Sequence, residues 1–174
     1  DLIDSLGAEY ADIYLTYAYR ASPCESVWFD DDGLERQEAM FQVREWYRDH
    51  GAETSDPRKR PDDHLVFQLL FVARLIDEGT GSKGLLDACR FMDDHLLRWL
   101  GQFCGRAASR CRSGYFAGLL LVTGAYSDEL RDLLARALEM PRPKRDEPGK
   151  GQRSRSPSCG RETAGFVPGT GPGW

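Results

Sequence analysis

Apolar residues in the first 140 positions recur at intervals of three and four, which is the spacing of one face of an α-helix. No stretch alternates apolar and polar residues between hairpin turns, as a pair of β-strands would. The sequence therefore predicts an all-α fold. Its helices are expected over residues 2–19, 34–50, 65–76 and 85–104, with a last one from an N-cap at Ser113 to about Met140.

Turn residues divide these helices. Pro23 ends the first helix because proline lacks a backbone N–H, and Gly51 lies where a C-cap glycine is expected. Pro61 suits the first turn of the third helix, and Asp62 and Asp63 favour a helix N-terminus through the helix dipole. Glycines at 79 and 81 predict a turn before the fourth helix.

The expected core follows from the same periodicity. The helix over 65–76 is apolar at almost every position and should be covered on most sides. The last helix is expected to turn one stripe inward, made of Tyr115, Leu119, Val122, Tyr126, Leu130, Leu133, Leu134 and Leu138. After position 140 Pro, Gly, Ser and Arg dominate, so we expect a single compact helical domain over 1–140 and a disordered, flexible tail over 141–174.

Charge is divided unevenly between these two parts. Residues 1–140 hold 16 Lys or Arg against 25 Asp or Glu, whereas 141–174 hold seven against three. An acidic body disfavours binding to nucleic acid and attracts cationic partners, although negative charge also simply maintains solubility. A structural adaptor that docks a basic partner by bulk charge is therefore one reading of the sequence.

The sequence also indicates a compartment. No window is apolar over the roughly 18 residues that a membrane span needs, and the start has no signal-peptide pattern. The chain begins with Asp1 and not Met, so we expect residues before it. Five cysteines without a CxxC pair argue against a disulfide framework or a zinc ribbon, and favour a reducing compartment such as the cytoplasm.

Two Asp-Asp-His groups are the strongest candidates for metal chemistry. Asp62-Asp63-His64 and Asp93-Asp94-His95 would make an all-α metal-binding hydrolase or sensor if they met in space. Adjacent residues on a helix point in different directions, so neither group is a metal site by itself. A helix-capping role for the first group and a surface position for His95 are the simpler interpretation. No G-x-S-x-G or phosphate-loop motif occurs, and we predict no catalytic residue and no cofactor.

Three motifs resemble those of one family. They are Pro23-x-Glu25-Ser26-Val27-Trp28, Pro61-x-Asp63-His64-Leu65, and the H-L-x-x-W-x-x-x-F pattern of residues 95–103. Their order and spacing are similar to the TorD/DmsD/NarJ superfamily of cytoplasmic redox-enzyme maturation chaperones, closest to the TorD/DmsD type. The resemblance implies an all-α fold without enzymatic turnover, and it implies helices before Asp1 that this chain lacks.

The same resemblance implies partners. Such chaperones bind the twin-arginine signal peptide, the apo-form, or both, of a DMSO-reductase-type molybdoenzyme precursor, and assist cofactor insertion and assembly before export. The expected chain is a monomer or homodimer that neither inserts into membranes nor binds nucleic acid.

The residues implied as the signal-peptide site are few. Carboxylates accept paired hydrogen bonds from arginine, and tryptophan covers apolar segments, which suits a leader of two arginines followed by an apolar stretch. Position 68 is Gln where many members of the family have Glu. The implied site comprises Pro61, Asp63 and His64, with Glu25, Ser26, Trp28, Gln68 and Trp46 around them.

Overall fold

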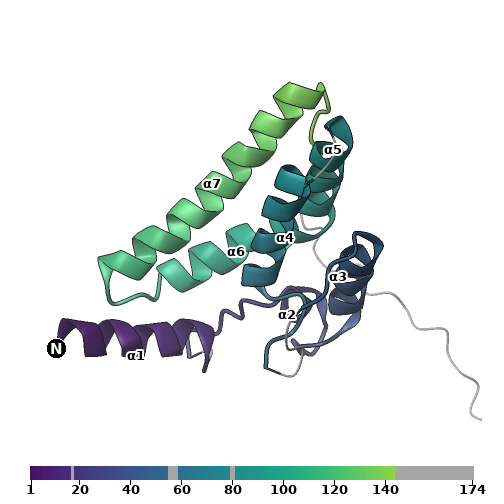
Figure 1. Cartoon of the computed structure of the whole chain (residues 1–174). Coiled ribbons are helices and arrows are strands. Elements are labelled where there is room, and N and C mark those ends of the chain that lie inside the picture. The colour runs from purple at the N-terminus through teal and green to yellow at the C-terminus, as the bar shows by residue number, and fades with distance from the viewer. Residues whose placement is uncertain (17, 55–58, 79–80, 144–174) are drawn as a thin grey trace, which may run out of the picture. The chain divides into compact units, whose positions relative to one another are not determined.

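In the computed structural model, residues 1–143 are described, apart from 17, 55–58 and 79–80, and Asp1–Pro143 form one compact unit. These residues contain no strand, only one isolated antiparallel bridge, so the predicted all-α fold is confirmed. The elements, shown in Figure 1, are α1 (Leu2–Tyr14), α2 (Ser26–Phe29), α3 (Glu38–Asp49), α4 (Leu65–Glu78), α5 (Ser82–Phe91), a π-helical turn η1 (Met92–Leu96), α6 (Leu97–Ala108) and α7 (Gly114–Leu138).

The core lies among the later helices. α4 packs on α5, both contact η1, and α6 lies along α7. Large aromatic side chains fill the centre, since Phe91, Trp99 and Phe103 are fully buried. Trp99 and Phe103 contact each other with ring centroids 5.7 Å apart, an arrangement that adds to the burial of each ring.

Several boundaries differ from the periodicity. The first helix ends at Tyr14, and α3 begins at Glu38 because the Asp30 carboxylate accepts the backbone N–H groups of Asp32 (3.1 Å) and Leu34 (2.8 Å) and extends the preceding turn. The predicted helix over 85–104 is interrupted by η1. The predicted turn after α4 lies partly outside the described residues, as does the predicted tail from Lys144 onward.

The prediction for the buried face of α7 was wrong. The N-cap is confirmed, because Ser113 accepts the N–H of Phe116 at 3.4 Å. However, most of the stripe that was expected inward is exposed, with side chains 44% to 65% accessible, namely Tyr115, Leu119, Val122, Tyr126 and Leu133. α7 buries Leu134 as expected, but its other buried residues are Phe116, Leu120, Ser127 and Arg131, which the predicted stripe did not include. It has apolar residues on two sides, and the inward side is the one whose arginine meets a carboxylate of η1.

A buried acid of α1 connects this helix to the start of α7. Glu9 is almost fully buried, and its carboxylate accepts the N–H groups of Arg112 and Ser113 (3.1 Å), at the start of α7. The Tyr19 hydroxyl also donates to Glu9 (3.3 Å). These contacts hold α1 against the α6–α7 connection, although α1 buries little else besides Ile13.

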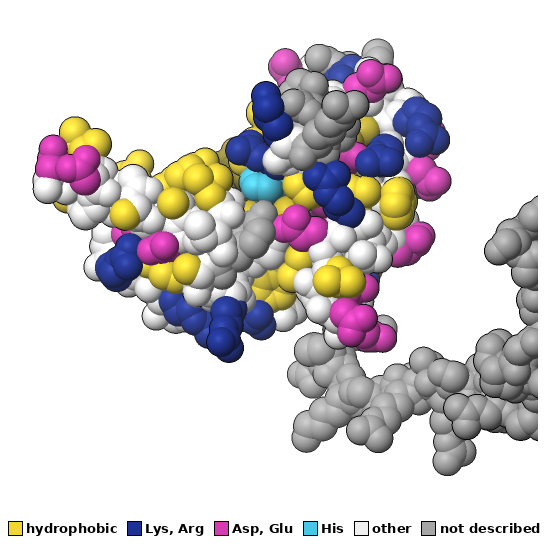
Figure 2. Space-filling model, turned by 90° about the horizontal axis from the view of Figure 1, so that it is seen from below, with side chains coloured by type: hydrophobic (Ala, Val, Ile, Leu, Met, Phe, Trp, Pro, Cys, Tyr) yellow, Lys and Arg dark blue, Asp and Glu magenta, His cyan; other side chains and the backbone are white. Residues whose placement is uncertain are grey.

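The described surface is mixed in character. Seen from below, hydrophobic, acidic and basic side chains alternate without one sign of charge dominating (Figure 2). The hydrophobic part includes Leu2, Ile3 and Tyr10 of α1. Within the described residues, no helix has both the length and the apolar character required to cross a membrane.

Candidate functional site

The two proline-led motifs, whose prolines are 38 residues apart, meet in a junction between the segment before α2 and the segment before α4. Cys24 and His64 form the isolated antiparallel bridge. The N–H of Leu65 donates to the carbonyl of Pro23 at 2.8 Å, and the N–H of Glu25 donates to the carbonyl of Asp63 at 3.2 Å. The junction therefore rests on only a few backbone hydrogen bonds between segments distant in sequence.

Asp63 is the central acid of this junction and is fully buried. Its Oδ2 accepts the backbone N–H of Ser26 at 2.7 Å and also the Ser26 hydroxyl. Its Oδ1 is buried without a hydrogen-bond partner. Burial raises the pKa of the Asp63 carboxyl, the nearby Glu25 adds to that increase, and the Ser26 hydrogen bonds oppose it. A buried acceptor without a partner is costly in a folded protein, so a hydrogen-bond donor placed near Oδ1 would be stabilising.

Glu25 is the second fully buried acid, and it connects the junction to the core. Its Oε2 accepts Nε2 of Gln68 at 2.6 Å, and its Oε1 lies 3.2 Å from Nδ1 of His95. Gln68 in turn accepts the indole N–H of Trp99 at 3.3 Å. Glu25, Ser26, Asp63 and Gln68, four of the residues implied by the family motifs, thus form one hydrogen-bonded cluster.

His64 is nearly buried beside this cluster. Burial, and secondarily the charge of Arg60, lowers the pKa of His64 to about 4, so the imidazole is neutral at pH 7. Its Nδ1 accepts the N–H of Val66 at 3.2 Å, which places the ring proton on the other nitrogen. Pro61 accepts the N–H of His64 at 3.1 Å and so completes the turn that leads into α4.

The neighbouring Asp62 has a separate role. Its carboxylate pairs with Arg44 of α3 at 2.6 Å and accepts the hydroxyl of Thr54. Its carbonyl accepts the Tyr47 hydroxyl at 3.0 Å. Asp62 therefore ties α3 to the junction and does not point toward Asp63's partners.

The two tryptophans of the implied site lie on different sides of the cluster. Trp28, half-buried, donates its indole N–H to the carbonyl of Ser22 (3.0 Å) and stacks on Trp99 with ring centroids 6.4 Å apart. Trp46 of α3 is also half-buried and stacks on His50, and its edge contacts His95. Trp28 contacts Trp99 of α6, and Trp46 contacts His95 of η1, so each ring reaches the cluster through a residue that is hydrogen-bonded to it.

The surface beside Trp28 is basic, contrary to the acidic approach expected from net charge. Arg106 lies over the Trp28 ring at 4.5 Å, and Arg98 lies over the Phe29 ring at 4.1 Å. An open pocket of about 460 Å³ adjoins the same segment. Its lining is largely small or apolar with one acid and one base, and consists of Arg20, Ala21, Ser22, Val27, Gly33, Leu34 and Glu35.

The metal alternative finds no support in the geometry. Asp62 pairs with Arg44, and Asp93 pairs with Arg131, so both carboxylates already face arginines. Among the residues that the structure describes, no group of three or more His, Cys, Asp or Glu side chains is placed to hold a metal ion.

Sequence reasoning misplaced one part of the cluster. His95 was expected at the surface, but it is buried and faces Glu25. The signal that identifies it is the third motif, because His95, Leu96, Trp99 and Phe103 are all buried. The four clustered side chains are enclosed as well, so a peptide reaches them only if the segment before α2 moves.

The fold and this junction define an all-α domain built around a buried pair of acids. The chain belongs to the nitrate reductase delta subunit family, since the sequence profile of that family matches residues 1–105. Membership confirms the resemblance to the TorD/DmsD/NarJ superfamily that the motifs indicated.

Curated relatives agree with this assignment. The chain is 26% identical to the chaperone protein TorD of Vibrio vulnificus over 129 residues, which are 70% of this chain and 60% of that protein. Identity to the chaperone protein TorD of Vibrio cholerae serotype O1 is 33% over 109 residues, 58% of this chain and 49% of that protein. The Tat proofreading chaperone DmsD of Salmonella paratyphi A is 27% identical over 88 residues, 50% of this chain and 41% of that protein.

These relatives are named as chaperones and not as enzymes, in agreement with the prediction of a protein without catalytic turnover. The chain spans about 60% or less of the length of each of the three. No solved structure matches the chain.

Proposed function

We propose that this protein is a maturation chaperone that binds the twin-arginine signal peptide of a redox-enzyme precursor at the junction of the two proline-led motifs. The precursor is proposed to be the apo-form of a DMSO-reductase-type molybdoenzyme, held in the cytoplasm until its cofactor is inserted. The family assignment supports a chaperone, and the chemistry of the junction supports an arginine-bearing ligand.

The observation that carries this proposal is that Oδ1 of Asp63 is buried without a hydrogen-bond partner. A guanidinium supplies several N–H donors in a planar fork and pairs with carboxylates through two parallel hydrogen bonds. Asp63 and Glu25 place two acids in one buried cluster, and the neutral His64 adds no competing positive charge. An arginine entering the cluster would both satisfy Oδ1 and relieve the repulsion between the acids.

Entry requires the segment of Pro23–Glu25 to part from His64. That step breaks few backbone hydrogen bonds and exposes Ser26, while α4 remains intact. The adjoining pocket, with apolar walls from Val27 and Leu34, can take the apolar residues that follow the arginines.

Titration calorimetry with a synthetic twin-arginine leader tests the proposal. The folded chain should bind the leader saturably, and a leader with both arginines replaced by alanine should bind at least tenfold more weakly. Asp63→Asn keeps the acceptor for Ser26 but removes the charge, so it should weaken binding of the intact leader by a similar factor.

Asp94→Asn is the matched control. Asp94 belongs to the second Asp-Asp-His group, but its side chain is exposed on η1. Its substitution should leave leader binding unchanged while circular dichroism confirms equal helicity in all variants. Saturable binding that does not distinguish the arginine leader from the alanine leader would refute arginine recognition at Asp63.

A further inference from the structure

The π-helical turn η1 lies between the candidate site and the far end of the molecule. It joins α5 to α6 and contacts α4 as well. π-helical turns are rare, mostly arise as single wide turns inside α-helices, and are frequent at functional sites. Here the wide turn carries Asp93 and His95, two residues whose side chains leave the helix in different directions.

Each of these side chains makes a buried polar contact with a different part of the fold. His95 lies 3.2 Å from the Glu25 carboxylate, inside the junction. Asp93 receives the guanidinium of Arg131 from α7 through Nε (3.0 Å) and Nη2 (2.7 Å). One turn of helix therefore links the buried acids of the junction to α7.

The contact with α7 is geometrically strict. The Arg131 side chain is fully excluded from solvent, and the Asp93 side chain is only 10% exposed. A buried guanidinium has no water to replace its partner, so the pair holds its orientation by two-point geometry. Arg131 also donates to the carbonyl of Met140 at 3.4 Å, beyond the end of α7.

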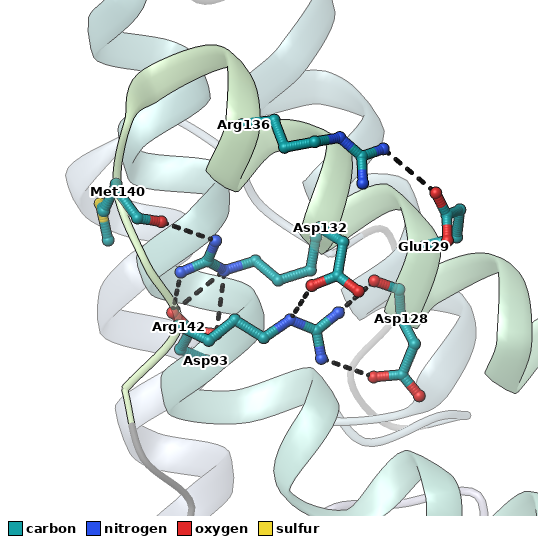
Figure 3. Close-up of polar contacts among 8 residues, drawn as sticks. Asp93, Asp128, Glu129, Asp132, Arg136, Met140 and Arg142 are labelled. Carbon is teal, nitrogen blue, oxygen red and sulfur yellow. Dashed lines mark hydrogen bonds and ion pairs between the residues drawn. The ribbon is translucent and has the colours of Figure 1, made fainter.

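The end of α7 reinforces this arrangement. Figure 3 shows Arg142 between Asp128 and Asp132, with Asp93 and Met140 beside them. Arg142 lies 2.9 Å from the Asp128 carboxylate and 2.6 Å from that of Asp132. The chain after α7 thus folds back over the place where Arg131 meets η1.

We propose that Arg131 and Asp93 are positioning residues for the leader-binding junction, because they fix the orientation of η1 that holds His95 against Glu25. This inference rests on the proposed function for its consequence in binding. Its structural content does not depend on the ligand. Loss of the Arg131–Asp93 pair lets η1 turn, weakens the His95–Glu25 contact, and loosens the segment of Glu25 and Ser26.

The test compares two double variants of the full chain. Arg131→Met with Asp93→Asn removes the buried pair without leaving one charge alone. Arg136→Met with Glu129→Gln removes an exposed pair on the same helix, in which both side chains are more than 60% accessible. Amide hydrogen exchange by NMR is measured for Ser26, whose N–H is bonded to Asp63, and for Val43, buried in α3.

The ratio of the Ser26 and Val43 exchange rates separates local loosening from a general loss of stability. In the buried double variant this ratio should rise at least tenfold, and the side-chain nitrogen resonances of His95 should shift. Leader affinity should fall about tenfold in the same variant. The exposed double variant should match the unmodified chain in all three measurements.

A milder variant keeps the test valid if the buried double variant does not fold. Arg131→Lys retains the charge but loses the two-point geometry, so it should raise the exchange ratio by a smaller factor. An unchanged ratio and unchanged His95 resonances in a folded variant that lacks the buried pair would overturn the inference. If the unmodified chain binds no leader, the proposed function fails, whereas the exchange ratio still decides the role of Arg131.

Discussion

Arg131 of α7 and Asp93 of η1 form a two-point ion pair in which the arginine side chain has no exposed surface. This contact explains why α7 turns the side with Leu120 and Arg131 inward and leaves the stripe with Val122 and Tyr126 exposed. The pair replaces hydration that both ions lose on folding, so each ion depends on the other.

Removal of one partner alone should therefore be severe. Arg131→Ala leaves the Asp93 carboxylate largely buried without its cation, and we expect a loss of about 3–5 kcal/mol in the free energy of unfolding. The double variant with Asp93→Asn should recover a substantial part of that loss. Denaturant unfolding measures both, and equal losses in the single and the double variant would argue against a charge-pair origin.

The orientation of α7 predicts opposite outcomes for two neighbouring apolar residues. Leu120 is buried, so Leu120→Ala should cost about 2–5 kcal/mol in unfolding free energy through lost contacts and a cavity. Val122 is 64% exposed, so Val122→Ala should change stability by less than about 0.5 kcal/mol. Similar costs at both positions would mean that the exposed stripe is covered in solution.

The anchor of α1 gives a third prediction. Glu9→Ala should lower the unfolding free energy by about 1–3 kcal/mol, because the partly buried N–H groups of Arg112 and Ser113 lose their acceptor. Asp12 lies on α1 like Glu9, and Asp12→Ala removes an ion pair with the largely exposed Arg112 side chain. This substitution should lower the unfolding free energy by about 0–1 kcal/mol. Thermal unfolding of the two variants, followed by circular dichroism, ranks them directly.

Acid sensitivity should depend on His64. The unfolded chain binds a proton at His64 near pH 6.5, whereas the folded chain binds it only near pH 4, so protonation favours unfolding and stability falls as pH decreases through this window. His64→Gln should remove up to about 3 kcal/mol of that pH dependence between pH 7 and pH 4. Asp63, whose pKa is raised, contributes in the opposite direction but is present in both proteins, so it largely cancels in the difference.

The measurement is the difference in unfolding free energy between His64→Gln and the unmodified chain at several pH values. His50→Gln is the control, since His50 is the C-cap residue of α3 and is only half-buried. A difference that stays constant with pH would show that His64 is not held neutral in the folded protein.

The sequence by itself determined the class of fold, the Ser113 N-cap and the family, because helical periodicity, capping residues and ordered motifs are local features. The family resemblance also named Glu25, Asp63 and Gln68, which are members of the junction cluster. Only the tertiary structure decided that these acids are enclosed, since burial depends on what packs over a residue.

Tertiary contacts also decided two of the features that periodicity predicted wrongly. The helix over 85–104 reads as continuous, yet η1 widens one turn of it, and this turn carries the His95 that faces Glu25 and the Asp93 that faces Arg131. α7 is apolar on two sides, so its own pattern cannot choose an inward face. The choice was made by a carboxylate on another helix, because a buried arginine is stable only opposite an acid.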